Sequence, residues 1–280
     1  MRAGQALLAR GFFGRSLDHV KRQAGVVWNL ETVKGASKPR PLYDWTTEDD
    51  AKASIVMSDE IIGGKSTSHL DFVSQPNTTS NAPSSSSSSS STSQLSTSIP
   101  TSYARFHGHI STALPENLPD VKRTGYAAFR TPSQGATVFG RSYWDIDPYI
   151  YLALRIKSDG RHYFVNLQTE SIEPSDIHQH RLFAKRPGEW ETILLKWNDF
   201  VRTNHGFVIE PQTGMLRQKV RTLGIGLTDR VEGPFDFCIE RAWATNNPDD
   251  GDQFVERKRD VNDDAGGGGL KTRKGTKVQW

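Results

Sequence analysis

The stretch 149–170, YIYLALRIKSDGRHYFVNLQTE, constrains the fold more than any other part of the chain. Apolar residues alternate with polar or aromatic ones from Ile150 to Ile156, and again from Tyr163 to Leu167. A period of two in β-branched and aromatic residues is typical of half-buried strands. The pair Asp159-Gly160 between the two halves accepts the positive φ angles of a tight turn. We therefore predict a paired hairpin, which needs a larger sheet around it because two strands alone are unstable in water.

Other segments with strand-like composition surround this hairpin. They are 41–45, two short strands within 55–72, 103–111, 125–130, 178–184, 190–197, 220–228 and 235–245. Many short strands separated by turn signals are typical of sandwiches and jelly rolls. We expect an all-β jelly-roll sandwich with a short N-terminal helix over 16–30. A helical turn capped by Thr47 is also expected, because Asp50 follows three residues later.

Low-complexity segments divide the chain. Serine runs unbroken from 84 to 91, and residues 74–102 are too polar to offset the entropy of ordering. We expect a disordered insertion there, at the tip of a hairpin, because strand-like segments flank it. The predicted organisation is a targeting or amphipathic segment over 1–39, a sandwich domain over 40–247, and a disordered charged and Gly-rich tail over 248–280.

Charge, cysteine content and hydropathy narrow the possibilities only in part. The net charge of +3 over 280 residues does not by itself indicate nucleic-acid binding, and the single Cys238 cannot form an intrachain disulfide. No apolar run reaches the roughly 18 residues that cross a bilayer. Residues 1–14 contain Arg2 and Arg10 without an acid, interleaved with apolar residues. This pattern is typical of a mitochondrial import presequence, and an ordinary N-terminus remains the alternative.

Candidate chemistry is sparse. The string GGKST resembles a phosphate-binding loop, but Asp59 stands where that loop requires its first glycine. His178 and His180 share one side of a strand and are the best metal candidates, although exposed strand histidines are the favoured interpretation. Cys238 lies mid-strand and is interpreted as an inert small hydrophobe. Loop acids that a glycosidase could use are Asp145, Asp147, Glu170 and Glu173.

Several spaced blocks between residues 41 and 245 resemble the complex I intermediate-associated protein 30 family, in the form of a fungal-type member. The most specific blocks are Gly63-Gly64 with Ser66, Phe106-x-Gly108, Asp159-Gly160-Arg161 with Tyr163, Gly188-x-Trp190 and Gly233-x-Phe235. The resemblance implies a galactose-binding-domain-like jelly roll. It also implies a mitochondrial assembly factor for respiratory NADH:ubiquinone oxidoreductase, and it offers no catalytic residue. The serine insertion and the Gly-rich tail depart from the family pattern.

The resemblance leads to a specific functional expectation. We expect a non-enzymatic chaperone on the matrix side of the inner membrane, peripheral to the membrane at most, without cofactor, metal or nucleic acid. Its partners would be subunits of a membrane-arm assembly intermediate and other assembly factors. The residues predicted to anchor a partner are Trp144, Tyr149, Arg155 and Arg161. The resemblance also favours an import signal at the N-terminus, while a retained amphipathic segment over 12–28 stays open.

Two alternatives belong to other classes. A carbohydrate- or small-ligand-binding jelly roll would show a groove with a stacked aromatic, because this architecture is widely used for sugars. Trp144, in the loop RSYWDIDP, is a candidate for such stacking, or it closes one end of the core. A glycosidase would need two acids facing each other across a cleft.

Overall fold

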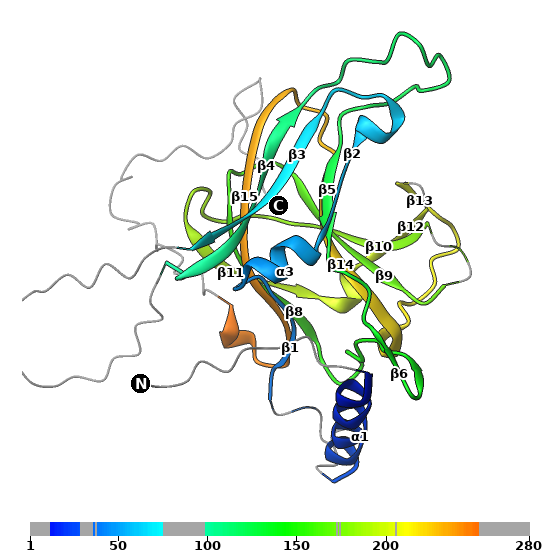
Figure 1. The fold of residues 1–280 in the computed structure, drawn as a ribbon, viewed down its shortest axis with the longest axis vertical. Coiled ribbons are helices and arrows are strands. Elements are labelled where there is room, and N and C mark those ends of the chain that lie inside the picture. Colours follow the sequence, from blue (N-terminus) through cyan, green and yellow to red (C-terminus); the bar gives the residue numbers. More distant parts are fainter. Residues whose placement is uncertain are drawn as a thin grey trace, which may run out of the picture.

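Two antiparallel sheets packed face to face make up the molecule (Figure 1). The computed structural model describes residues 12–28, 36, 38–74, 99–171, 173, 175–204 and 206–251. The fold is a jelly-roll β-sandwich with a short N-terminal helix, α1 (Phe12–Trp28), which confirms the predicted fold class. None of the described helices is long and apolar enough to cross a bilayer.

The first sheet has the order β11-β8-β15-β4-β3, with β1 also paired to β15. Its strands are β1 (Arg40–Asp44), β3 (Thr67–Ser74), β4 (Ser102–Ile110), β8 (Tyr151–Ser158), β11 (Trp190–Lys196) and β15 (Gly233–Thr245). Strand β15 is central, because it is bordered by β8 along one edge and by β4 and then β1 along the other.

The second sheet has the order β13-β12-β10-β9-β14-β5-β2. Its strands are β2 (Ile55–Ser58), β5 (Ala127–Arg130), β9 (Tyr163–Thr169), β10 (Asp176–Arg181), β12 (Val201–Asn204), β13 (Phe207–Val208) and β14 (Val220–Leu227). A separate ribbon joins β6 (Ala136–Thr137) to β7 (Gly140–Arg141) beside α1. The short helices are α3 (Glu48–Ala53), η1 (Asp59–Ile62), η2 (Trp197–Asp199), η3 (Arg217–Lys219) and η4 (Pro248–Asp250).

Aromatic side chains fill the space between the sheets. Phe106 of β4 packs against Phe129 of β5 with ring centroids 4.9 Å apart, and Tyr163 of β9 packs against Phe237 of β15 at 4.7 Å. All four side chains are buried. Each contact joins one sheet to the other, and burial of such a ring stabilises the fold by roughly 1.5–3 kcal/mol. These pairs hold the two layers together.

The predicted hairpin over 149–170 is wrong in its pairing, although both strands exist. Strand β8 pairs with β11 and β15 in the first sheet, whereas β9 pairs with β10 and β14 in the second. The turn at Gly160, with φ of 91°, carries the chain from one sheet to the other. Both faces of β8 are largely buried. The alternation in its sequence therefore does not reveal which strands it pairs with.

The hairpin that brackets the serine-rich segment is confirmed. Strands β3 and β4 are antiparallel partners, and Ser74 lies opposite Ser102 at the open end of the pair. Residues 75–98 between them lie outside the described residues, as do residues 1–11 and the tail from 252. The capped turn at Thr47 is also confirmed, because its side chain accepts the Asp50 N–H at 3.2 Å.

Candidate functional site

Residues of the family-like blocks gather at one end of the sandwich. We call it the Arg161 end. It contains the turn 159–162 between β8 and β9, the loop 228–234 before β15, and the loop 59–66 after β2. Gly233 of β15 pairs with Ile110 of β4, and Ser111 follows in contact with the loop 59–66. Segments that are distant in sequence therefore meet there.

Arg161 holds the loop 228–234 in place through its guanidinium group. Its guanidinium forms a bidentate ion pair with Asp229, with nitrogen–oxygen distances of 2.7 and 3.0 Å. It also donates to the carbonyl oxygens of Val231, Gly233 and Pro234. The side chains of Arg161 and Asp229 are only 14% and 6% exposed, so the pair is held away from water. Paired, bidentate and shielded charges of this kind fix loop geometry.

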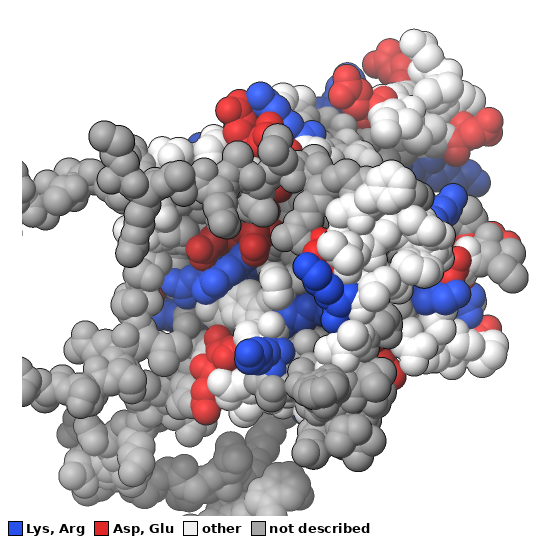
Figure 2. All heavy atoms as spheres, turned by 60° about the horizontal axis from the view of Figure 1, so that its bottom comes forward, with Lys and Arg blue, Asp and Glu red and all other residues white. Residues whose placement is uncertain are grey.

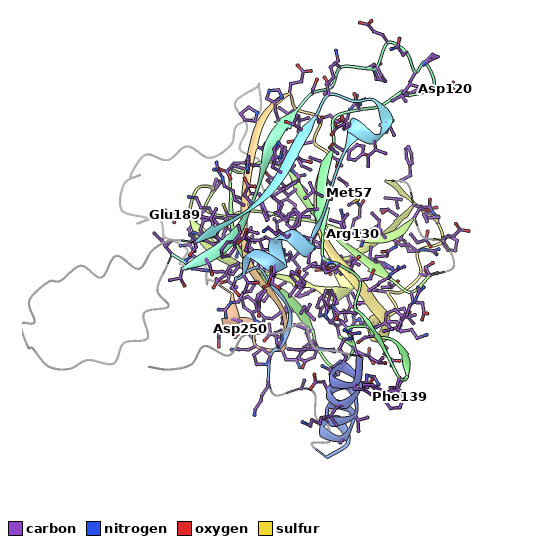
Figure 3. The ribbon with its side chains drawn as sticks, viewed as in Figure 1. Met57, Asp120, Arg130, Phe139, Glu189 and Asp250 are labelled. Carbon is purple, nitrogen blue, oxygen red and sulfur yellow. The ribbon has the colours of Figure 1, made fainter. Side chains whose placement is uncertain are left out.

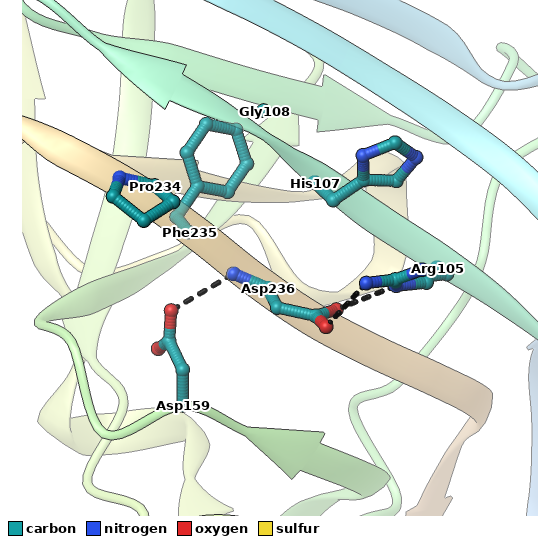
Figure 4. Close-up of a pocket in the computed structure, with 7 residues that line it drawn as sticks. All are labelled: Arg105, His107, Gly108, Asp159, Pro234, Phe235 and Asp236. Atoms are coloured by element: carbon teal, nitrogen blue, oxygen red, sulfur yellow. Dashed lines mark hydrogen bonds and ion pairs between the residues drawn. The ribbon is translucent and has the colours of Figure 1, made fainter.

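The turn acid Asp159 ties the same loops together. One carboxylate oxygen accepts the Arg161 N–H at 2.9 Å, and the other accepts the Tyr163 hydroxyl at 3.1 Å and the Asp236 N–H at 2.8 Å. Burial, followed by the charge of Asp159, raises the pKa of Tyr163, which stays a neutral donor. Figure 4 shows the bond from Asp236 to Asp159 and the bidentate pair of Asp236 with Arg105.

Asp59 is the second polar centre of this end. It is fully buried, and its carboxylate accepts the Ser66 N–H and hydroxyl at 2.9 Å each and the Gly125 N–H at 2.5 Å. A Cβ at Gly64 would lie 2.2 Å from the Asp59 carboxyl carbon. Gly64 and Ser66 of the family-like block therefore enclose this carboxylate, and Gly63 ends η1 in the left-handed conformation, with φ of 82°.

Two shallow hollows open on the Arg161 end. The first, of about 360 Å³, is lined by Arg105, His107, Gly108, Asp159, Pro234, Phe235 and Asp236. The second, of about 230 Å³, is lined by Arg161, His162, Asp229, Val231, Glu232, Gly233 and Pro234. The acids Asp159, Asp229 and Asp236 are already engaged with protein donors. The one Phe, Tyr or Trp side chain in either lining, Phe235, is buried against Phe106, so neither hollow offers such a ring for stacking.

The four predicted anchor residues do not form one exposed surface. Trp144 is buried and bridges Val220, so it closes the core as one of the two interpretations expected. Tyr149 and Arg155 are buried as well, at 6% and 7% exposure, and only Arg161 reaches the Arg161 end. Contact with a partner would require three of them to become exposed.

The other candidate groups have structural surroundings. His178 is buried, which corrects the expectation of an exposed strand histidine, and burial lowers its pKa. Burial raises the pKa of the Cys238 thiol to about 12, in agreement with an inert residue. Glu170 pairs with Lys219 and accepts the Tyr143 hydroxyl. Within the described ranges no group of three His, Cys, Asp or Glu residues could hold a metal ion.

Comparison with solved structures gives weak similarity only. A family 11 carbohydrate-binding module from Clostridium thermocellum covers 75% of this chain and 97% of its own, with a TM-score of 0.48 and 12% identity. An exo-β-agarase gives a TM-score of 0.41 at 10% identity, over 75% of this chain and 25% of that one. Similarity at this level carries no argument about ligands.

Comparison of sequences is decisive. The family model described as complex I intermediate-associated protein 30 matches residues 43–239. "Complex I intermediate-associated protein 30, mitochondrial" of Neurospora crassa is 50% identical over 279 residues, which is 100% of this chain and 97% of the relative. The Mus musculus protein of the same name is 27% identical over 88% of this chain and 64% of its own length. These relatives place the chain in the mitochondrion. It belongs to the complex I intermediate-associated protein 30 family.

Proposed function

We propose that this protein is a non-catalytic assembly factor of mitochondrial complex I that works on the matrix side of the inner membrane. The observation that carries the proposal is the full-length relation to the Neurospora protein, whose name describes association with a complex I intermediate. The partner would be a membrane-arm assembly intermediate, together with other assembly factors. Temporary coverage of subunit surface that later becomes buried is the task such a protein performs.

The chemistry of the fold supports a binding role. The polar groups of the Arg161 end hold loops in place. Asp59 accepts hydrogen bonds from Ser66 and Gly125, and Arg161 pairs with Asp229. A catalytic site needs acids, bases or nucleophiles that face a substrate, and these groups face one another. A rigid sandwich with a transient interface of about 1,200–2,000 Å² suffices for a chaperone.

The four predicted anchors enter the proposal in a changed role. Arg161 contributes to partner binding through the loop 228–234, whose carbonyl groups it fixes. Trp144, Tyr149 and Arg155 support the interface from the interior, since they are buried. The carbohydrate-binding alternative has no specific observation in its favour, because the two hollows present no exposed Phe, Tyr or Trp ring.

Deletion of the gene tests the proposal directly. Native gels of solubilised mitochondria should then lack assembled complex I and contain a partial membrane-arm complex in its place. In the wild-type strain, the tagged protein should purify with that partial complex and be absent from the finished enzyme. Normal amounts of complex I in the deletion strain refute the proposal, and so does stable association with the finished enzyme.

A further inference from the structure

Helix α1 contacts the sandwich through its polar side. The contacts recorded are Arg15 Nε to the Ala136 carbonyl at 3.1 Å, the Val138 N–H to Ser16 Oγ at 2.9 Å, the His19 ring to Phe139 at 5.5 Å, and Arg22 to the Asp145 carbonyl at 3.3 Å. Arg15, His19 and Arg22 are spaced by four and three residues, so they form one stripe along the helix. This stripe faces the β6–β7 ribbon.

Three apolar side chains on one side of α1 are exposed. Phe13, Leu17 and Val20 have the same spacing of four and three, and they are 80%, 55% and 47% exposed. A helix on a globular protein ordinarily buries its apolar stripe and leaves its polar stripe in water. The described side chains of α1 show the reverse orientation, and the exposed stripe loses the hydrophobic stabilisation that burial would provide.

The tip of the β6–β7 ribbon adds two exposed apolar side chains beside α1. Val138 and Phe139 are 57% and 64% exposed, and Phe139 lies beside α1 at the lower end of the view in Figure 3. We call these five side chains the α1 patch; they are Phe13, Leu17, Val20, Val138 and Phe139. Exposed apolar side chains gathered at one place are the usual mark of an interaction surface.

Two basic residues accompany the α1 patch. Lys21 is next in sequence to Val20 and is exposed on α1, and Arg141 is exposed on β7. Arg15 and Arg22 are engaged with the carbonyl groups of Ala136 and Asp145 on the other side of the helix. Figure 2, which brings the lower end of Figure 1 forward, shows uncharged surface bordered by Lys and Arg together with some Asp and Glu.

We propose that the α1 patch docks on an anionic lipid surface. A helix with an exposed apolar stripe and flanking cations lies in the membrane interface, where apolar burial and attraction to anionic lipid add together. The patch consists of a helix and a ribbon tip that stand out from one end of the sandwich (Figure 1), a convex shape that fits a plane. The proposal goes beyond complex I assembly, because lipid binding requires no other protein.

Flotation with lipid vesicles tests the proposal. The purified full-length chain should float with phosphatidylcholine vesicles that contain cardiolipin and remain unbound with phosphatidylcholine alone. Substitution of Phe13, Leu17 and Val20 together by Gln, which preserves helix propensity, should lower the bound fraction at least about tenfold. Lys21→Glu should weaken binding several-fold, and higher salt should weaken it as well, because the charge attraction is screened.

A matched control comes from the other side of the molecule. Phe207 and Val208 on β13 are 62% and 65% exposed and lie away from α1 in Figure 1. Their replacement by Gln should leave flotation unchanged. Melting curves of all variants establish that each is folded.

Three results would overturn the proposal. They are failure of the wild-type chain to float with anionic vesicles, equal flotation of the triple Gln variant, and a mature protein in mitochondria that begins after Trp28. The last would mean that α1 serves import and is removed. None of these results depends on complex I, so each is separate from a failure of the proposed function.

Discussion

The two ends of the sandwich use their polar side chains differently. At the Arg161 end, buried charges such as Asp59 and Asp229 find donors within the chain, although Ile61 and Val231 in the same loops are 78% and 58% exposed. At the end that carries α1, polar side chains are used for internal contacts, while Phe13 and Phe139 remain exposed. The first end uses its buried charges to hold loops, and the second end leaves the apolar stripe of a helix exposed.

This difference separates stability from binding. Family-like blocks of sequence cluster at the Arg161 end, yet their side chains stabilise loops. The α1 patch contributes little to the fold and offers the apolar area that binding requires. Substitutions at the two ends should therefore have opposite consequences, large for unfolding at the first and small at the second.

The largest effect is expected from Asp59→Ala. Three buried donors, from Ser66 and Gly125, lose their acceptor, and hydrogen bonds to a charged group contribute about 1.5–3 kcal/mol each. We expect the free energy of unfolding to fall by about 3–5 kcal/mol in urea titrations. The exposed neighbour Glu60, replaced by Ala, is the control and should cost less than about 0.5 kcal/mol. Equal stability of the two variants would contradict the claim that the Asp59 hydrogen bonds stabilise this end.

Arg161→Gln should have the next largest effect. The variant leaves Asp229 charged and shielded from water, and it releases the carbonyl groups of the loop 228–234. Loss of one partner of a shielded pair costs about 2–4 kcal/mol, which urea unfolding should record. Arg105→Gln, at a pair whose side chains are both 46% exposed, should cost under about 1 kcal/mol. If Arg105→Gln is the more costly of the two, the account of this end is wrong.

The pH dependence of stability sharpens the same point. Burial raises the pKa of the Asp229 carboxyl, but the Arg161 pair and the Val231 N–H bond outweigh it, so the pKa lies below its ordinary value of 3.8. A lowered pKa in the folded state stabilises the protein above 3.8, and this contribution is lost as the pH falls through the folded-state value. The stability gap between the wild type and Asp229→Asn should therefore narrow below pH 4. A constant gap would contradict the pairing.

The smallest effect is expected at the α1 patch. Leu17→Gln replaces an exposed side chain by one of similar helix propensity, so unfolding should change by less than about 0.5 kcal/mol. Thermal melting compared with Leu152→Ala, in the fully buried core, gives the contrast, since that change should cost about 2–5 kcal/mol. A large loss at Leu17 would mean that the stripe packs inside the fold.

Local patterns predict local structure in this chain. Strand β9 is predictable because Tyr163, Val165 and Leu167 alternate with half-buried residues, and the cap at Thr47 follows from Asp50. The partner of a strand is not predictable in this way. A tight turn at Gly160 fits a hairpin and a crossing between sheets equally well, and the distant strands β11 and β14 decide between them.

The burial of the predicted anchors also depends on segments that are distant in sequence. Trp144 looks like a loop residue in sequence, but its backbone pairs with Val220, far along the chain. The structural role of Asp59 is not predictable from the sequence pattern, because a single acid has no periodicity. The nearby Gly63-Gly64 and Ser66 are the sequence signal for the loop that encloses it. The reversed orientation of α1 also depends on tertiary contacts, since its amphipathic pattern does not state which side meets the protein.

Rescue of the deletion strain by the triple Gln variant of Phe13, Leu17 and Val20 tests the central claim most directly. A foreign cleavable presequence on both this variant and the wild type makes import independent of α1. The account predicts equal amounts of folded protein in mitochondria, with assembled complex I restored by the wild type and strongly reduced with the variant. Full restoration of complex I by the variant would contradict it.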